Sequence, residues 1–168
     1  MAGGVVAGSR RPVAVTPAGN ICWAFATGTE LEIKSSPATG VDGTVYVPSL
    51  DGNLYSVRPD GTERWHFRCG SYTESSPVVE GAGNVYVVVI VAAGIYAEYR
   101  VTPAGQGHTI SGLSCEVAAD GVVYFMSDRY LYAVQPIGSG LPPAKSSWPM
   151  FRANVRHTGR VGAGIKAN

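Results

Sequence analysis

The pattern Gly-x-Val-Tyr-Val recurs along the chain at a nearly constant spacing, and this repeat constrains the fold more than any other feature. It begins at Gly43 and again at Gly83, and a related copy that ends in Phe begins at Gly121. Self-similarity at a period of about 40 residues is typical of repeat proteins, and a strand-rich unit of that length matches one blade of a β-propeller. The sequence therefore predicts an all-β fold built from β-propeller-type, four-strand meander blades.

The clearest unit spans residues 35–70. Three Asp-Gly pairs separate its apolar runs, at residues 42–43, 51–52 and 60–61. Asp-Gly between alternating apolar runs is the strongest short-range signal for a hairpin, because both turn positions can require a positive φ. We therefore expect this unit to form a meander of four strands.

The remaining units are less regular, and together they give about three and a half repeats. We expect an N-terminal extension at 1–12, a single repeat domain at 13–160 and a flexible tail at 161–168. Within the domain, the predicted parts are a half unit at 13–34, units at 35–70, 75–112 and 113–136, and a closing segment at 145–160. The half unit supplies only two strands, unless residues 1–12 add another in an irregular way.

Composition supports β structure and limits the function classes. The chain has 22 Gly and 11 Pro, and no sustained 3.6-residue apolar period, so we expect almost no helix. No apolar run is long enough to span a membrane, and a net charge of +1 gives no field for nucleic acid. The stretch from Lys145 onward contains no acidic residue, which predicts a solvated tail or, as an alternative, a site for phosphate or an acidic partner.

Two further features bear on location and redox chemistry. Residues 1–10 lack the basic start and long apolar stretch of a signal peptide, so the chain as written is expected in the cytoplasm, or it is a piece of a longer secreted parent. Cys22, Cys69 and Cys115 are odd in number and form no Cys-x-x-Cys pair. We expect them to be small buried hydrophobic residues on strands, with no disulfide framework and no metal site.

The acidic and histidine residues do not form a recognisable catalytic set. Each of four Asp residues precedes a Gly in a predicted turn, where its side chain can accept from local backbone amides; these are Asp42, Asp51, Asp60 and Asp120. The histidines are far apart in the sequence, and no Gly-x-Ser-x-Gly elbow is present. We therefore expect no catalytic, cofactor-binding or metal-binding residue.

The motifs of the repeats, and their order, resemble those of the quinoprotein-like (PQQ-like) β-propeller repeat family. The resemblance rests on units of the form Ser-Ser-Pro, Asp-Gly-x-Val-Tyr-Val, Asp-Gly-x-Leu-Tyr, Pro-Asp-Gly-Thr and Trp-x-Phe, and on a closing Trp-Pro-Met-Phe…His-Thr-Gly segment at 148–159. Family members usually have seven or eight blades, and a Trp late in each blade docks against the neighbouring blade. Trp23 and Trp65 match that position, whereas the second and third full units lack it.

The resemblance is specific for fold and leaves function open. Cofactor-binding members hold pyrroloquinoline quinone with a stacked Trp, a calcium ion, a catalytic Asp and often a vicinal Cys pair, and this chain has no vicinal Cys pair. The family also includes noncatalytic scaffolds, such as the outer-membrane-protein assembly lipoprotein. We therefore expect a noncatalytic module for protein binding or assembly. The alternatives are a degenerate fragment of a quinoprotein dehydrogenase, or a small-ligand or carbohydrate binder with a tyrosine rim at Tyr72, Tyr96, Tyr99 and Tyr130.

An incomplete propeller predicts self-association. About three and a half units fall short of a closed ring, and open blade faces with unpaired strand edges favour association. We expect a homodimer that completes a ring of about seven blades, and the alternative is a four-bladed monomer closed by its own ends. The interface is predicted at an aromatic and basic cluster near the C-terminus, made of Trp148, Met150, Phe151, Arg152 and His157.

Overall fold

A computed structural model describes residues 4–6, 11–28, 32–73, 75–92, 95–110, 115–117, 123–127 and 130–134. Within these ranges every regular element is a β-strand, and the strands form four antiparallel sheets. Each sheet is a meander, because its strands pair in sequence order. The all-β, propeller-type prediction is therefore confirmed.

The strand boundaries follow the predicted units. The first sheet contains β1 (Gly4–Val6), β2 (Val13–Val15) and β3 (Ile21–Ala24). The second contains β4 (Ala38–Thr39), β5 (Val45–Pro48), β6 (Asn53–Val57) and β7 (Glu63–Arg68). The third contains β8 (Val78–Val79), β9 (Val85–Ala92), β10 (Ile95–Val101) and β11 (Gly107–Ile110). The fourth contains β12 (Cys115–Val117), β13 (Val123–Ser127) and β14 (Tyr130–Val134).

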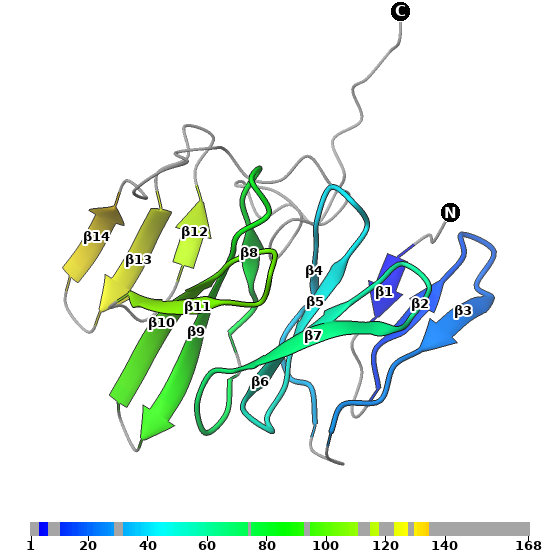
Figure 1. The fold of residues 1–168 in the computed structure, drawn as a ribbon, viewed down its shortest axis with the longest axis horizontal. Helices are drawn as coiled ribbons and strands as arrows, with labels where there is room; N and C mark the ends of the chain where they lie inside the picture. Colours follow the sequence, from blue (N-terminus) through cyan, green and yellow to red (C-terminus); the bar gives the residue numbers. More distant parts are fainter. Residues whose placement is uncertain are drawn as a thin grey trace, which may run out of the picture.

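The four sheets follow one another along the longest axis of the molecule (Figure 1). The first sheet, drawn in blue, lies at one end, and the fourth sheet, drawn in yellow, lies at the opposite end. The described sheets therefore form an open series whose first and last members are far apart.

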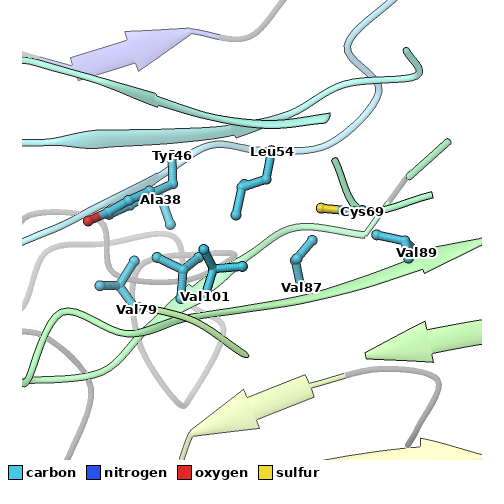
Figure 2. Packing of buried hydrophobic residues seen from close by; sticks show 9 residues of the cluster. Ala38, Tyr46, Leu54, Cys69, Val79, Val87, Val89 and Val101 are labelled. Carbon is cyan, nitrogen blue, oxygen red and sulfur yellow. The ribbon is translucent and has the colours of Figure 1, made fainter. Parts of the chain in front are cut away.

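The apolar core lies between sheets, so each sheet depends on its neighbours. One cluster joins the second and third sheets, where Tyr46 and Leu54 point toward Val87 and Val101 (Figure 2). A second cluster joins the first and second sheets and includes Phe25 and Val47. Alternate residues of a strand face opposite sides, so the second sheet contributes to both clusters. This explains why all four residues of β5 are buried.

The predicted Asp-Gly turns form, but they are longer than a two-residue hairpin loop. In the loop between β4 and β5, Gly40 N donates to Thr44 O at 2.8 Å and Gly43 N donates to Gly40 O at 3.1 Å. Gly43 has a φ of +80°, which matches a three-residue loop that ends in a left-handed glycine. Asp42 Oδ1 accepts from Thr44 N at 3.0 Å, as predicted for these acids.

The same side-chain cap occurs in the next two turns, while the fourth predicted one cannot be compared. Asp51 Oδ1 accepts from Asn53 N at 2.9 Å, and Asp60 Oδ1 accepts from Thr62 N at 2.9 Å. Asp120 lies outside the described residues. These aspartates thus stabilise loops through backbone amides.

The N-terminal sheet contains one strand more than the two that the half unit predicts. β1 pairs with β2 so that Gly4 lies opposite Val15, just as Val45 of β5 lies opposite Val57 of β6. By this register β1 corresponds to β5, which is the second strand of a complete sheet. The segment before residue 13 therefore supplies the irregular strand that the sequence left open.

Candidate interaction site

Two tryptophans connect neighbouring sheets by the same contact. Trp23 of β3 donates its Nε1 hydrogen to Pro59 O at 2.9 Å, and Trp65 of β7 donates to Pro103 O at 3.0 Å. Each acceptor lies in the turn before the last strand of the following sheet. Each indole therefore contacts a Pro-x-Gly turn of the next sheet.

The glycine of each turn is required both by its backbone and by the indole above it. Gly61 and Gly105 have φ values of +88° and +82°. A Cβ at Gly61 would lie 2.7 Å from the Trp23 Cγ, and a Cβ at Gly105 would lie 3.0 Å from the Trp65 Cγ. The distance at Gly61 leaves no room for a methyl group, and at Gly105 the indole would have to shift by a few tenths of an ångström. The Pro-x-Gly turn and the Trp therefore form a complementary pair.

A phenylalanine two residues after each tryptophan extends the contact. Phe25 meets Tyr55 edge-on with ring centroids 5.5 Å apart, and Phe67 meets Tyr99 in the same way at 5.4 Å. Such edge-to-face pairs add about 0.5–1.5 kcal/mol beyond the area that they bury. The Trp-x-Phe motif therefore docks one sheet on the next through two side chains.

The first sheet carries a third turn of this kind, which we call the open docking turn (residues 16–20). Thr16 N donates to Asn20 O at 2.8 Å, Gly19 N donates to Thr16 O at 2.9 Å, and Gly19 has a φ of +84°. A Cβ at Gly19 would meet no described atom within 4 Å. Within the described part of the chain, this turn therefore has the docking geometry but no indole on it.

The other predicted site residues have varied positions. Tyr72 is 39% exposed and forms a backbone bridge with Ile90, whereas Tyr99 packs against Phe67 between two sheets. Nothing is described of the side chains of Tyr96 and Tyr130. The predicted interface cluster, Trp148 to His157, lies outside the described residues. The rim and the interface thus remain predictions.

The cysteines differ from one another in burial. Cys69 is 2% exposed within the core cluster, and desolvation raises the pKa of its thiol to about 12. Cys22 is exposed, so the expectation that it is buried was wrong. It is the extra residue at a bulge, because Ile21 pairs with Val15 and Trp23 pairs with Ala14. The Cys115 side chain lies outside the described part.

The buried polar groups form structural contacts that the sequence did not predict. Tyr55 Oη donates to Asp51 Oδ2 at 2.7 Å and accepts from Gly28 N at 2.8 Å, which ties the segment after the first sheet to the second sheet. Desolvation and the hydrogen bond to Asp51 raise the pKa of Tyr55. Glu80 is also fully buried, and its carboxylate accepts from Asn84 Nδ2 and Tyr86 Oη.

The titratable groups that are described do not assemble into a metal centre. Among them, no cluster of three or more His, Cys, Asp or Glu residues could hold a metal ion. His66 Nδ1 lies 2.8 Å from Glu63 Oε1 on an exposed strand, and His108 is exposed on β11. The same part of the chain has no helix long and apolar enough to cross a membrane.

Comparison with known proteins supports the fold. No protein-family model matches the sequence, and no curated protein matches it significantly. Among solved structures, BamB from Moraxella catarrhalis is similar with a TM-score of 0.62 at 16% identity, over 82% of this chain and 42% of that one. A protein of unknown function from Bacteroides caccae is similar with a TM-score of 0.50 at 14% identity, over 83% of this chain and 60% of that one.

These likenesses concern architecture, and the chain spans less than two thirds of either relative. They agree with the all-β series of antiparallel meander sheets described above. The chain therefore has a propeller-type repeat fold like that of BamB, as its resemblance to the PQQ-like repeats predicted.

Proposed function

We propose that the chain is a noncatalytic repeat module that acts through protein–protein contacts, and that a second copy of itself completes its ring. The observation that carries this proposal is the difference between its two ends. The first sheet lacks a described partner strand beyond β1, where the complete sheets have β4 or β8. The fourth sheet lacks a described strand after β14, where the complete sheets have β7 or β11.

The first and fourth sheets are each incomplete, and they lack different strands: the first sheet lacks a described first strand, and the fourth lacks a described last strand. In a head-to-tail arrangement, the last sheet of one copy meets the first sheet of the other, and this contact occurs twice around a two-fold axis. Two copies of a four-sheet chain supply eight sheets, one more than the ring of about seven expected from the sequence, because β1 adds a third strand to the N-terminal half unit. Eight sheets are within the range of about 4–8 blades of closed propellers. The position of the first and fourth sheets at opposite ends favours this arrangement over closure within one chain (Figure 1).

The share of the BamB chain that this chain covers also supports the proposal. The chain matches 42% of the BamB chain, as expected for a module that makes up about half of a complete ring. A BamB-like propeller fold also supports a role in binding or assembly at a coarse level.

The solution mass tests the proposal. Size-exclusion chromatography with multi-angle light scattering, run over a hundredfold range of protein concentration, should give a species of twice 17.6 kDa that dissociates on dilution. A single species of 17.6 kDa at every concentration would remove self-assembly from the proposed function.

A further inference from the structure

We propose that the open docking turn (residues 16–20) is the receptor for Trp148 of a second copy of the chain. The proposal rests on the self-assembly proposed above, and it names the surface and the side chain that form the seam. It follows from comparing three turns of the same geometry.

All three turns have the same backbone hydrogen bonds, and they span Thr16–Asn20, Arg58–Thr62 and Thr102–Gln106. In each, the first residue donates to the carbonyl of the fifth, and the fourth is a glycine with a positive φ. The second and third turns each accept a Trp Nε1 hydrogen at the Pro carbonyl. Pro17 O has the same place in the first turn. The first turn therefore offers the same acceptor and the same glycine surface.

The space above the glycine separates the first turn from the other two. At Gly61 and Gly105 an added Cβ would come within 3.0 Å of an indole, whereas at Gly19 it would meet no described atom within 4 Å. Pro17 and Ala18 beside it are exposed. An indole-sized surface with a carbonyl acceptor is thus left uncovered in the described part of the chain.

The composition of the chain indicates the occupant. The sequence contains three Trp residues, and Trp23 and Trp65 already occupy the two filled turns. Trp148 remains, and Met150 stands two residues after it, at the spacing that Phe25 and Phe67 have from the other two, with Phe151 one residue further. A Pro-x-Gly sequence at 136–138 comes between β14 and Trp148, which is the order of turn and Trp in the second sheet. The segment after the fourth sheet therefore supplies the one Trp of the sequence that does not occupy a described turn, after a Pro-x-Gly sequence and with an apolar residue at the +2 position.

The geometry points to a second copy as the source of this indole. The open docking turn belongs to the first sheet, and Trp148 follows the fourth, and these two sheets lie at opposite ends of the molecule (Figure 1). In the head-to-tail pair, the fourth sheet of one copy lies next to the first sheet of the other. Trp148 of one copy then contacts the open docking turn of the other copy.

The indole N–H signals of ¹⁵N-tryptophan-labelled protein test the contact directly. Substitution of each Trp by Phe assigns the three signals. In the dimer, the Trp148 signal should exchange slowly with solvent, as the signals of the hydrogen-bonded Trp23 and Trp65 do. Gly19→Ala places a methyl group in the receptor, so it should free the Trp148 signal and raise the dimer dissociation constant about tenfold or more. The Trp23 and Trp65 signals should not move.

Gly83→Ala is the matched control, because Gly83 has a φ of +85°, close to that of Gly19, and its nearest neighbour is Pro103 rather than a Trp. It introduces the same backbone strain away from the receptor, together with a contact of 3.2 Å with Pro103 Cγ, so any shift of an indole signal is expected at Trp65 and not at Trp148. The control should leave the Trp148 signal and the dimer unchanged, and a loss of the docked signal in both variants would overturn the proposal.

A mixing experiment decides which copy supplies the receptor. Labelled Gly19→Ala protein has an intact Trp148 and a blocked turn, and unlabelled Trp148→Phe protein has an open turn. Mixing the two should restore the slow-exchanging Trp148 signal. If mixing fails and the wild-type signal stays docked in a 17.6 kDa species, Trp148 occupies the turn of its own chain and the proposal is wrong. A dimer with a freely exchanging Trp148 overturns this contact alone, whereas a monomer with a free Trp148 overturns the proposed function too.

Discussion

Replacing Trp65 by Ala should separate the contribution of inter-sheet docking from that of the strands themselves. The indole donates to Pro103 O at 3.0 Å, covers Gly105, and packs against the cluster between the second and third sheets. The change removes all three contacts and leaves the backbone pairing of β7 with β6 in place.

The magnitude follows from what the side chain loses. A Trp→Ala change in a core costs about 3–5 kcal/mol. Trp65 is only partly buried, so the lower end of that range applies, and we expect the free energy of unfolding to fall by about 3 kcal/mol. With a urea m-value of about 2 kcal/mol/M, the midpoint should fall by about 1.5 M.

Urea unfolding followed by far-UV circular dichroism measures this shift. His66→Ala is the matched control, because His66 is the next residue on β7, is exposed, and contacts only Glu63 and the Tyr55 ring among the interactions described. It should cost about 0.5 kcal/mol. If the Trp65→Ala midpoint moves no further than that of His66→Ala, the indole does not hold the two sheets together.

A double-mutant cycle with Gly105 adds a second test. In the wild type, Gly105→Ala creates a contact of 3.0 Å with the indole and also strains a backbone at a φ of +82°. In the Trp65→Ala background only the strain remains, which costs about 1–2 kcal/mol. The two changes should therefore be coupled by about 1 kcal/mol, and full additivity would contradict the assigned contact.

Three further results are expected. Ellman's reagent should modify Cys22 in the native protein and Cys69 only on unfolding, because Cys22 is exposed and the Cys69 thiol is buried with a raised pKa; a Cys22→Ser variant that keeps a fast phase equal to that of the wild type would refute this for Cys22. Desolvation, reinforced by the Asp42 charge, raises the pKa of Tyr46 from 10.0 to about 12, which favours the neutral phenol in the folded state. The contribution of this raised pKa to the free energy of unfolding is complete below pH 10 and is lost as the pH rises toward 12. Tyr46→Phe should therefore flatten the alkaline fall in stability, and parallel curves of stability against pH for the variant and the wild type would argue against it. Titration with pyrroloquinoline quinone and calcium should give no saturable spectral shift at micromolar levels, and a saturable shift would favour the quinoprotein-fragment alternative.

Much of the fold could be predicted because its signals are local. The Gly-x-Val-Tyr-Val copies coincide with β5, β9 and β13, and the Asp-Gly pairs mark the turns beside them. Alternation and turn chemistry act over a few residues, so they can be recognised without knowing the tertiary structure. The turn length was less evident, since Asp-Gly also fits a three-residue loop in which only the glycine has a positive φ.

Other features depend on contacts that the sequence does not display. β1 (Gly4–Val6) is only three residues long and begins with a glycine, so it gives little local signal and its pairing with β2 decides its structure. Cys22 is exposed because β3 is the last strand of its sheet and is mostly exposed, with Ile21 and Ala24 exposed as well. Glu98 is fully buried at the position where the second sheet has Leu54, and alternation alone would favour an apolar residue there.

The placement of the core between sheets determines how local stability varies along the chain. A sheet with neighbours on both faces is stabilised twice, while a sheet at either end is stabilised once, so stability is expected to fall from the middle of the series toward its ends. Amide hydrogens of β5, β6 and β9 should therefore exchange slowest, and those of β1 to β3 and β12 to β14 should exchange through local opening. Growth by one repeat would turn a terminal sheet into an internal one, so such a chain becomes more stable as it is lengthened, until the series closes on itself.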